Sequence, residues 1–316
     1  MANDPITALI SSAYRESLEG ALPKGVTPLW YEGAEQFVEL APKAQVVWPD
    51  TALSGPMCEA VSQMTDLAWC SVISSGVDWL PLDTFRKRGV ALTNGAGIHA
   101  QAVAEYAIMG MLDLAKGWGE IVRAQDRREW LAQPPGLVEL LDTRVLVIGA
   151  GEIGRRIQTI LEAFGAKVTM ARRSPGEGEL GSDEWRGALG DFDWVVLIVP
   201  STPETTGMFG AEELATMKPG AALVNLARGS VVDQDALVAA LERGHLGGAY
   251  LDVTSPEPLP QDNPLWAMPN VRLSMHLAGR AQEALGRRGV QRFLGNLERF
   301  VKGEALEHQV DLSRGY

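Results

Sequence analysis

The chain has 316 residues, of which 46% are hydrophobic, and its 28 Lys and Arg against 40 Asp and Glu give a formal net charge of −12. This length favours two domains over one, and the acidic balance opposes non-specific attraction to nucleic acid or to an anionic membrane surface. No apolar run approaches the roughly 18 residues of a spanning helix, and Asp4 stands where a signal peptide has basic residues. We therefore expect a cytoplasmic protein without nucleic-acid or membrane partners.

The first hundred residues alternate candidate strands at 44–49, 67–73 and 89–94 with helical stretches, but they contain no glycine loop of the phosphate-binding type. This pattern predicts a smaller α/β lobe. Trp48 and Trp79 have two interpretations, as the lining of a pocket for a bulky substrate or as core residues, and core packing is the commoner one.

Cys58 and Cys70 are twelve residues apart and belong to no CxxC pair. They are predicted to be reduced, buried small hydrophobes. No pair of histidines or cysteines has the spacing of metal ligands, so no metal is expected.

Residues 99–117 predict a long helix rich in Ala and Met that is apolar on more than one face, and such a helix is expected to be buried against the other lobe or a second subunit. From about residue 144 onward, short β-rich runs alternate with amphipathic stretches, which indicates a parallel sheet with helices on both faces. The runs span 144–150, 166–172, 194–200, 221–227, 248–254 and 271–277.

Three further elements complete the prediction in chain order. Residues 174–185 are acidic and rich in glycine, and are predicted to be a flexible loop inside the second lobe. Asp233 is placed to cap a helix that ends near Gly244. Residues 285–303 predict a final helix that can return the chain to the first lobe, and its apolar positions recur every three or four residues. They are Val290, Phe293, Leu294, Leu297 and Val301.

A GxGxxG sequence stands directly after the first strand of the second lobe and directly before a helix. Its glycines are Gly149, Gly151 and Gly154. In this context the first permits a tight turn, the second lets backbone amides approach a pyrophosphate, and the third lets helix and strand pack closely. The pattern therefore predicts a dinucleotide site.

The end of the second strand indicates which dinucleotide binds. An acid commonly stands there to bond the adenosine ribose hydroxyls, whereas this chain has Arg172, Arg173 and Ser174. Together they form a seat for a 2′-phosphate, so NADP is predicted, with NAD as the weaker alternative. The competing interpretation is two solvated surface arginines, and Arg155 and Arg156 at the helix start are read in that way.

Three chemical groups follow successive strands of the second lobe, at the sheet edge where open α/β sheets bind ligands. Arg228, Glu257 and His276 together suit the reduction of a 2-keto acid. That reaction needs a cation for the substrate carboxylate and carbonyl oxygen, a proton donor for the developing alkoxide, and a carboxylate that keeps the donor protonated. Taken singly, each residue is weak support, and His99, His245 and His308 are read mainly as structural.

The chain resembles the D-isomer-specific 2-hydroxyacid dehydrogenases over nearly its whole length. The resemblance rests on GAGEIG at 149–154, VPSTPETTGMFG at 199–210, VNLARGSVVDQDAL at 224–237, GAYLDVTSPEPLPQDNPLW at 248–266 and PNVRLSMHLAG at 269–279. It implies a catalytic set that maps onto Arg228, Glu257 and His276. Two departures are visible: Met275 replaces a proline that commonly precedes the histidine, and Arg280 stands where a small hydroxyl residue is usual.

The resemblance also implies the further site residues and the architecture. Asp252 is expected to hold the nicotinamide carboxamide, with a packing role as the alternative, and the loop at 74–78 to cradle the substrate carboxylate through Ser75, Gly76 and Val77. Other cofactor contacts are expected at Glu152, Ile153, Pro200, Thr205 and Ala227. The expected fold is two Rossmann-like, doubly wound α/β lobes with parallel sheets and a cleft between them.

The predicted domains are a substrate-binding, flavodoxin-like domain (1–97 with 288–316) and an NAD(P)-binding Rossmann domain (98–287). The expected protein is a homodimeric, NADPH-dependent reductase that converts a 2-keto acid to a D-2-hydroxy acid. The alternatives are an NAD-dependent dehydrogenase that works in the oxidative direction and a non-catalytic, dinucleotide-sensing protein of the corepressor type. A formate dehydrogenase is disfavoured because those enzymes carry an amide where Glu257 stands.

Overall fold

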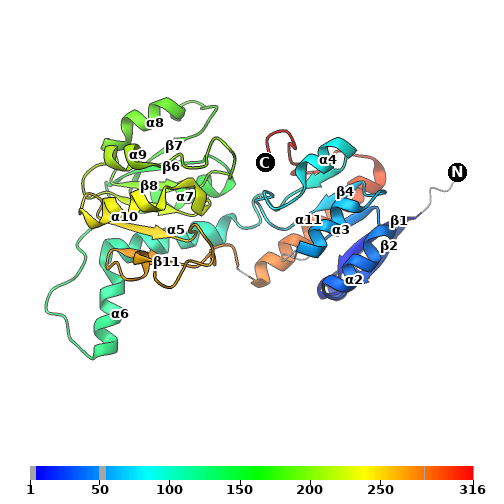
Figure 1. The fold of residues 1–316 in the computed structure, drawn as a ribbon, viewed down its shortest axis with the longest axis horizontal. Coiled ribbons are helices and arrows are strands. Elements are labelled where there is room, and N and C mark those ends of the chain that lie inside the picture. The colour runs from blue at the N-terminus through cyan, green and yellow to red at the C-terminus, as the bar shows by residue number, and fades with distance from the viewer. Residues whose placement is uncertain (1–4, 50–54, 281, 316) are drawn as a thin grey trace. The chain divides into compact units, whose positions relative to one another are not determined.

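The structure is a computed structural model that describes residues 5–49, 55–280 and 282–315. The chain divides into two units, Met1–His99 with Ala281–Tyr316, and Ala100–Arg280 (Figure 1). The boundary predicted at 287/288 falls inside α11 (Gln282–Lys302), a continuous helix that belongs to the first unit. The chain therefore returns to the first unit before this helix and not within it.

The first unit contains a five-stranded parallel sheet in the order β2-β1-β3-β4-β5. Its strands are β1 (Ile6–Ser11), β2 (Val26–Tyr31), β3 (Val46–Trp48), β4 (Trp69–Ser71) and β5 (Ala91–Thr93). Its other helices are α1 (Arg15–Leu18), α2 (Gly33–Leu40), α3 (Gly55–Gln63) and α4 (Leu82–Arg88), with 3₁₀ turns at Ser12–Tyr14 and Ala41–Lys43.

The strands of this sheet bury side chains on both faces because successive residues point to opposite sides. Leu9 lies in the core on the side of α2, α3 and α4, whereas its neighbour Ile10 lies in the core on the side of α1 and α11. Trp48 is buried on this second side, and its ring stacks on that of Phe293 with 4.5 Å between the ring centroids. Trp48 is therefore a core residue.

No strand is predicted before residue 44, and the structure has two there. The strand β1 is nearly continuous in apolar residues and is buried inside the sheet, so it lacks the alternation typical of a half-exposed strand. The strand β2 contains Pro28, which argues against a central strand, but β2 is an edge strand, where proline is tolerated.

The second unit contains a six-stranded parallel sheet in the order β11-β10-β9-β8-β6-β7. Its strands are β6 (Arg144–Ile148), β7 (Lys167–Ala171), β8 (Trp194–Leu197), β9 (Ala222–Asn225), β10 (Gly248–Leu251) and β11 (Val271–Leu273), which confirms all six predicted runs. Its helices are α5 (Ala100–Lys116), α6 (Trp118–Arg127), α7 (Glu152–Ala163), α8 (Ser182–Ala188), α9 (Ala211–Thr216) and α10 (Gln234–Glu242), with 3₁₀ turns at Leu189–Asp191, Gly229–Val231 and Pro264–Trp266.

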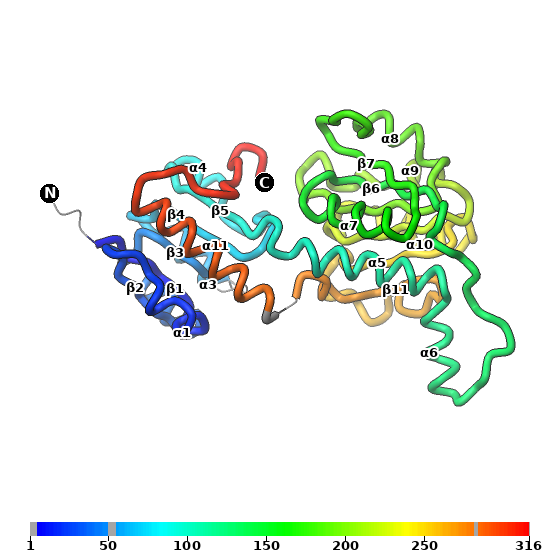
Figure 2. The backbone as a smooth tube through the Cα atoms, turned by 180° about the vertical axis from the view of Figure 1, so that it is seen from behind, coloured from blue at the N-terminus to red at the C-terminus, as the bar shows by residue number. Residues whose placement is uncertain are grey.

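Helices cover both faces of this sheet, as predicted for a doubly wound fold. One core contains Trp185, Leu214 and Leu237 from α8, α9 and α10, and the opposite core lies beneath α5 and α7. The helix α5 approaches the sheet closely because Gly110 lies against the ring of Tyr250, where a side chain would collide. The ribbon in Figure 1 and the backbone tube in Figure 2 both show α6 and the segment after it standing off the layers of this unit.

The local predictions on the second lobe and the last helix have mixed outcomes. Asp233 caps α10 as expected, because its carboxylate accepts a hydrogen bond from the N–H of Ala236 at 3.0 Å. The loop predicted for 174–185 is shorter than expected, since α8 begins at Ser182 and buries Trp185. The final helix is confirmed, although Val301 on its predicted apolar stripe is exposed.

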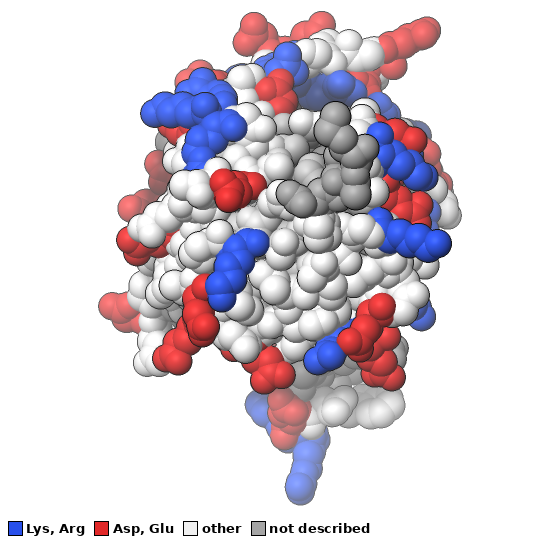
Figure 3. All heavy atoms as spheres, turned by 90° about the vertical axis from the view of Figure 1, so that its right-hand side faces the viewer, with Lys and Arg blue, Asp and Glu red and all other residues white. Residues whose placement is uncertain are grey.

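Charged side chains of both signs are interspersed on the face of the molecule shown in Figure 3, around an area formed by other residues. Among the described residues, every helix is too short or too polar to cross a lipid bilayer. Both cysteines are free thiols, Cys70 buried and Cys58 half-buried. Burial raises the pKa of each thiol, which makes them poor nucleophiles at neutral pH.

Candidate active site

The turn between β6 and α7 is built around the three glycines of the predicted dinucleotide loop. Gly149 has a φ of 122°, and a side chain there would collide with the carbonyl group of Ile198. A side chain at Gly154 would collide with the carbonyl oxygen of Gly149, so the helix packs closely on the turn. Gly151 is the N-cap of α7, and a side chain there would face open space. The N-terminus of α7 is thus open to an anion such as a pyrophosphate.

The other predicted cofactor contacts lie around this turn. Glu152 begins α7 and is exposed, and Ile153 is half-buried against the core. The hydroxyl of Thr205 donates a hydrogen bond to the carbonyl oxygen of Pro200 at 2.7 Å, which closes the loop after β8. Ala227 is buried just after β9. The sheet order reverses between β6 and β8, and ligands of open α/β sheets bind at such a point.

The three residues of the predicted 2′-phosphate seat follow β7 and are exposed. The Nε atom of Arg172 lies 3.8 Å from Oε2 of Glu179. The pKa of Glu204 is lowered first by a hydrogen bond from Thr202 and, to a smaller extent, by the positive charge of Arg173. The basic seat therefore has acidic neighbours that the sequence analysis did not predict.

Glu179 is the more buried of these two carboxylates, with only 6% of its side chain exposed. It accepts a hydrogen bond from the N–H of Gly176 at 2.8 Å and forms an ion pair with Arg155 on α7. The hydrogen bond from Gly176 is the first cause that lowers its pKa, and the charges of Arg155 and Arg172 act in the same direction, against the effect of burial. Local sequence patterns do not predict this contact, because Glu179 lies in the stretch expected to be a flexible loop, seven residues after Arg172.

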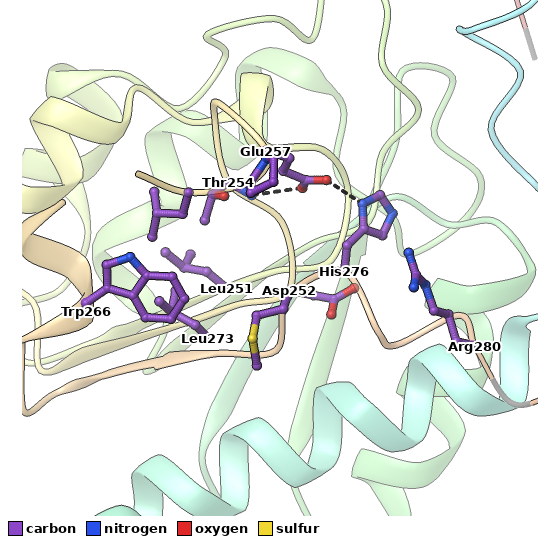
Figure 4. A pocket seen from close by; sticks show the side chains of 11 residues that line it. Leu251, Asp252, Thr254, Glu257, Trp266, Leu273, His276 and Arg280 are labelled. Atoms are coloured by element: carbon purple, nitrogen blue, oxygen red, sulfur yellow. Dashed lines mark hydrogen bonds and ion pairs between the residues drawn. The ribbon is translucent and has the colours of Figure 1, made fainter. Parts of the chain in front are cut away.

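The predicted acid and imidazole form a hydrogen-bonded pair. Nδ1 of His276 lies 2.7 Å from Oε2 of Glu257 (Figure 4). The other carboxylate oxygen of Glu257 accepts a hydrogen bond from the N–H of Thr254 at 3.1 Å, which holds the side chain in place. Both members of the pair are partly exposed, at 44% for the His276 side chain and 38% for that of Glu257, so the ring is accessible to a ligand.

Asp252 is buried just after β10 and anchors the loop that carries His276 through hydrogen bonds. Its Oδ1 atom accepts hydrogen bonds from the hydroxyl of Ser274 at 2.7 Å and from the N–H groups of Leu277 and Ala278 at 3.0 and 3.2 Å. His276 itself has a φ of 56°, a left-handed conformation that is uncommon for a non-glycine residue and persists where the surroundings hold it. The spacing of residues along the sequence does not predict these hydrogen bonds, which join segments more than twenty residues apart.

Arg228 follows β9, the strand beside β10, so it lies at the same edge of the sheet as Asp252 and Glu257. Its Nη1 atom donates a hydrogen bond to the carbonyl oxygen of Ala227 at 2.8 Å. The next residue, Gly229, lies so close to the backbone of Thr254 that a side chain would collide with it. This contact brings the turn that carries Arg228 against the segment that leads to Glu257.

A cavity of about 450 Å³ adjoins the Glu257–His276 pair. Its remaining wall is mostly apolar and comes from β10, β11 and the segments after them (Figure 4). The lining residues are Leu251, Asp252, Thr254, Glu257, Pro258, Leu259, Trp266, Leu273, Met275, His276 and Arg280. Both residues that depart from the family pattern, Met275 and Arg280, therefore lie at this cavity, and the imidazole still reaches Glu257 with Met275 in place.

In the first unit, the loop expected to hold a carboxylate follows β4. Four consecutive carbonyl groups accept hydrogen bonds, from His99 Nε2 to Ile73 O (2.7 Å), Gly95 N to Ser74 O (2.8 Å), Asn94 Nδ2 to Ser75 O (2.8 Å) and Trp79 Nε1 to Gly76 O (3.1 Å). Among the described residues, none accepts a hydrogen bond from the N–H groups of Ser75, Gly76 and Val77. Successive free amides of this kind can bind an anion.

The fold and the arrangement of these side chains are those of a nicotinamide-dependent α/β dehydrogenase. The family profile of the D-isomer specific 2-hydroxyacid dehydrogenase, NAD binding domain, matches residues 108–278. This match covers more than half of the chain, and the protein belongs to the D-isomer-specific 2-hydroxyacid dehydrogenase family of oxidoreductases.

Full-length relatives agree with this assignment. The chain is 32% identical over 309 residues to a glyoxylate/hydroxypyruvate reductase A of Salmonella heidelberg, which covers 95% of each protein. A family member from Aeromonas salmonicida is similar in structure, with a TM-score of 0.86 and 29% identity over 98% of this chain and 99% of that one. So is an NADPH-dependent glyoxylate/hydroxypyruvate reductase of Sinorhizobium meliloti, solved with NADP and malonate, with a TM-score of 0.81 and 25% identity over 98% of both chains.

Proposed function

We propose that the protein reduces a 2-keto acid to a D-2-hydroxy acid with NADPH, and that glyoxylate, hydroxypyruvate or a larger 2-keto acid is its substrate. The observation that carries this proposal is the 2.7 Å contact between Glu257 and His276 at the sheet edge that also holds the glycine loop and Arg228. An acid, an imidazole and a guanidinium at one edge match the needs of carbonyl reduction.

The chemistry divides between the cofactor and the side chains. A bound reduced nicotinamide supplies the hydride that adds to the keto carbon. His276 gives a proton from Nε2 to the carbonyl oxygen, since its Nδ1 atom is engaged with Glu257 at 2.7 Å. Glu257 holds the ring in the tautomer and orientation that this transfer needs, and it stabilises the protonated ring before the transfer.

Two groups are available to hold the substrate. The guanidinium of Arg228 attracts the substrate carboxylate and the carbonyl oxygen, on which negative charge develops during reduction. The N–H groups of Ser75, Gly76 and Val77 bind the carboxylate from the first unit, which gives that unit its role as the substrate-binding domain.

The residues after β7 support NADPH over NADH. The open N-terminus of α7 fits the pyrophosphate, and Arg172 with Arg173 and Ser174 fits a 2′-phosphate. The relative from Sinorhizobium meliloti is described as NADPH-dependent and was solved with NADP, which is consistent with this preference. NADH is the weaker alternative.

Steady-state assays of glyoxylate, hydroxypyruvate and phenylpyruvate with both cofactors test the proposal. We expect reduction of at least one of these acids, with a higher kcat/KM for NADPH than for NADH. A tenfold preference for NADH would refute the cofactor assignment, and no turnover together with tight cofactor binding would favour a sensing protein of the corepressor type.

A homodimer is also proposed. Seven of the thirteen large apolar side chains exposed among the described residues lie between 109 and 141, on α5, α6 and the segment after them, and clustered exposed apolar residues mark interaction surfaces. Sedimentation analysis should show a dimer that Trp118→Glu weakens and that Val38→Glu, an exposed site in the first unit, leaves intact. A monomeric wild-type protein would contradict this assignment.

A further inference from the structure

Glu179 is a buried carboxylate beside the proposed 2′-phosphate seat, and the proposed function gives it no role. Leu180 bridges to Ala171 at the end of β7, and the N–H of Arg172 donates to the carbonyl oxygen of Leu180 at 3.0 Å. These contacts place Glu179 alongside the end of β7. No acid stands at the end of β7 in the sequence, but the chain brings Glu179 to that position a few residues later.

Glu179 forms ion pairs with one arginine in each of the two parts of the proposed dinucleotide site, the pyrophosphate end and the adenosine ribose end. Arg155 stands in the first turns of α7, at the helix end proposed for the pyrophosphate, and Arg172 stands at the end proposed for the adenosine ribose. The pKa of Glu179 is lowered, first by the hydrogen bond from Gly176. The carboxylate is thus charged at neutral pH and lies 3.8 Å from the Arg172 guanidinium.

We propose that Glu179 is a specificity-determining residue of the dinucleotide site, which limits the preference for a 2′-phosphate over a 2′-hydroxyl. This inference rests on the proposed seat at Arg172. A 2′-phosphate bound to Arg172 brings a charge of about −1.5 to −2 near a fixed negative charge, whereas a 2′-hydroxyl brings none. Charges a few ångströms apart repel strongly at a partly buried site, so Glu179 disfavours NADPH and leaves NADH nearly unaffected.

The competing explanation is that Glu179 only closes its loop through Gly176. The chain offers a matched control for that role. Glu213 accepts a hydrogen bond from the N–H of Gly210 at 3.1 Å and pairs with Nε of Arg186 at 3.2 Å, and 17% of its side chain is exposed. It has the same kind of partners on α9, away from the end of β7.

Calorimetric titration with adenosine 2′,5′-bisphosphate and with 5′-AMP measures how much the 2′-phosphate contributes to binding affinity, without turnover. In Glu179→Gln we expect the affinity for the bisphosphate to rise about five- to tenfold and that for 5′-AMP to stay within twofold, with a smaller gain at high salt because the repulsion is screened. Glu179→Asp keeps the charge and should resemble wild type, and Glu213→Gln should change neither affinity.

Three outcomes would overturn the inference: an equal change for both ligands, a loss of bisphosphate affinity in Glu179→Gln, or the same ratio change in Glu213→Gln. Failure of the proposed NADPH preference is a separate result. It would appear in the wild-type protein as equal affinity for the two ligands, whatever the variants do. Steady-state kcat/KM values for NADPH and NADH should follow the binding ratios.

Discussion

The two ends of one sheet edge in the second unit both hold a carboxylate next to a basic group, but in different ways. Beyond β10 and β11, Glu257 and His276 form one short contact at 2.7 Å, and both side chains stay more than a third exposed. Beyond β7, the side chain of Glu179 is almost fully buried, forms ion pairs with two arginines and accepts a hydrogen bond from a backbone amide. The Glu257–His276 pair is positioned to exchange a proton with a ligand. Glu179 instead places a fixed negative charge beside the proposed 2′-phosphate seat.

This difference predicts which measurements each end controls. Changes at Glu257 and His276 should affect the chemical step and leave cofactor affinity nearly unchanged. Changes at Arg172 and Glu179 should affect the choice of cofactor and leave the chemical step nearly unchanged. Each variant below can break this division or sharpen it.

The largest effect is expected from His276→Ala, which removes the proposed proton donor. General acid catalysis by a positioned side chain contributes about 10²–10⁴-fold, so kcat should fall by that factor. Fluorescence titration with NADPH should give a dissociation constant within about twofold of wild type, since the residues proposed to hold the dinucleotide remain. A variant that keeps wild-type kcat would remove His276 from the mechanism.

The next effect is expected from Asp252→Ala, which changes none of the three proposed catalytic residues but removes the anchor of the loop that carries His276. Buried donors that lose an acceptor cost about 1–3 kcal/mol each, so thermal unfolding should shift to lower temperature. Because small displacements of catalytic groups reduce the rate strongly, kcat should fall about tenfold or more. Leu223→Ala, a core change in β9 away from this loop, should lower stability with a smaller loss of kcat, and equal losses in both variants would mean that Asp252 acts through stability alone.

The contrast between the two ends also explains what the sequence predicted. Glu257 and His276 each stand at a strand end of a strongly periodic lobe, so their meeting follows from the rule that parallel strands end at one edge. The glycine loop follows from the same kind of local reasoning. The position of Glu179 and the hydrogen bonds of Asp252 depend on the path of irregular segments, which local periodicity does not encode. The strands β1 and β2 show no clear alternation of apolar and polar residues, because β1 lies inside the sheet and β2 is an edge strand.

At the other end, Arg172→Ala should change the cofactor ratio. A hydrogen bond to a charged group contributes about 1.5–3 kcal/mol, so the KM for NADPH should rise about tenfold or more while that for NADH stays within twofold. Arg86→Ala removes an exposed arginine paired with Asp83 in the first unit and should change neither KM. Equal rises for both cofactors would show that Arg172 does not receive the 2′-phosphate.

The smallest effect is expected in the first unit, where His99 holds the carbonyl group of Ile73 at 2.7 Å. The loop's free amides can face an anion only while its carbonyls are held elsewhere, so His99→Ala should loosen the proposed carboxylate cradle. A net hydrogen bond is worth about 0.5–1.5 kcal/mol, which corresponds to a KM for the keto acid about two- to tenfold higher, with kcat and the KM for NADPH near wild type. His99→Gln, which keeps a donor, should restore part of the affinity. A loss of kcat without a change in KM would instead connect His99 to the chemical step. The first unit would then contribute to catalysis as well as to binding of the substrate carboxylate, and the division of roles between the two units would not hold.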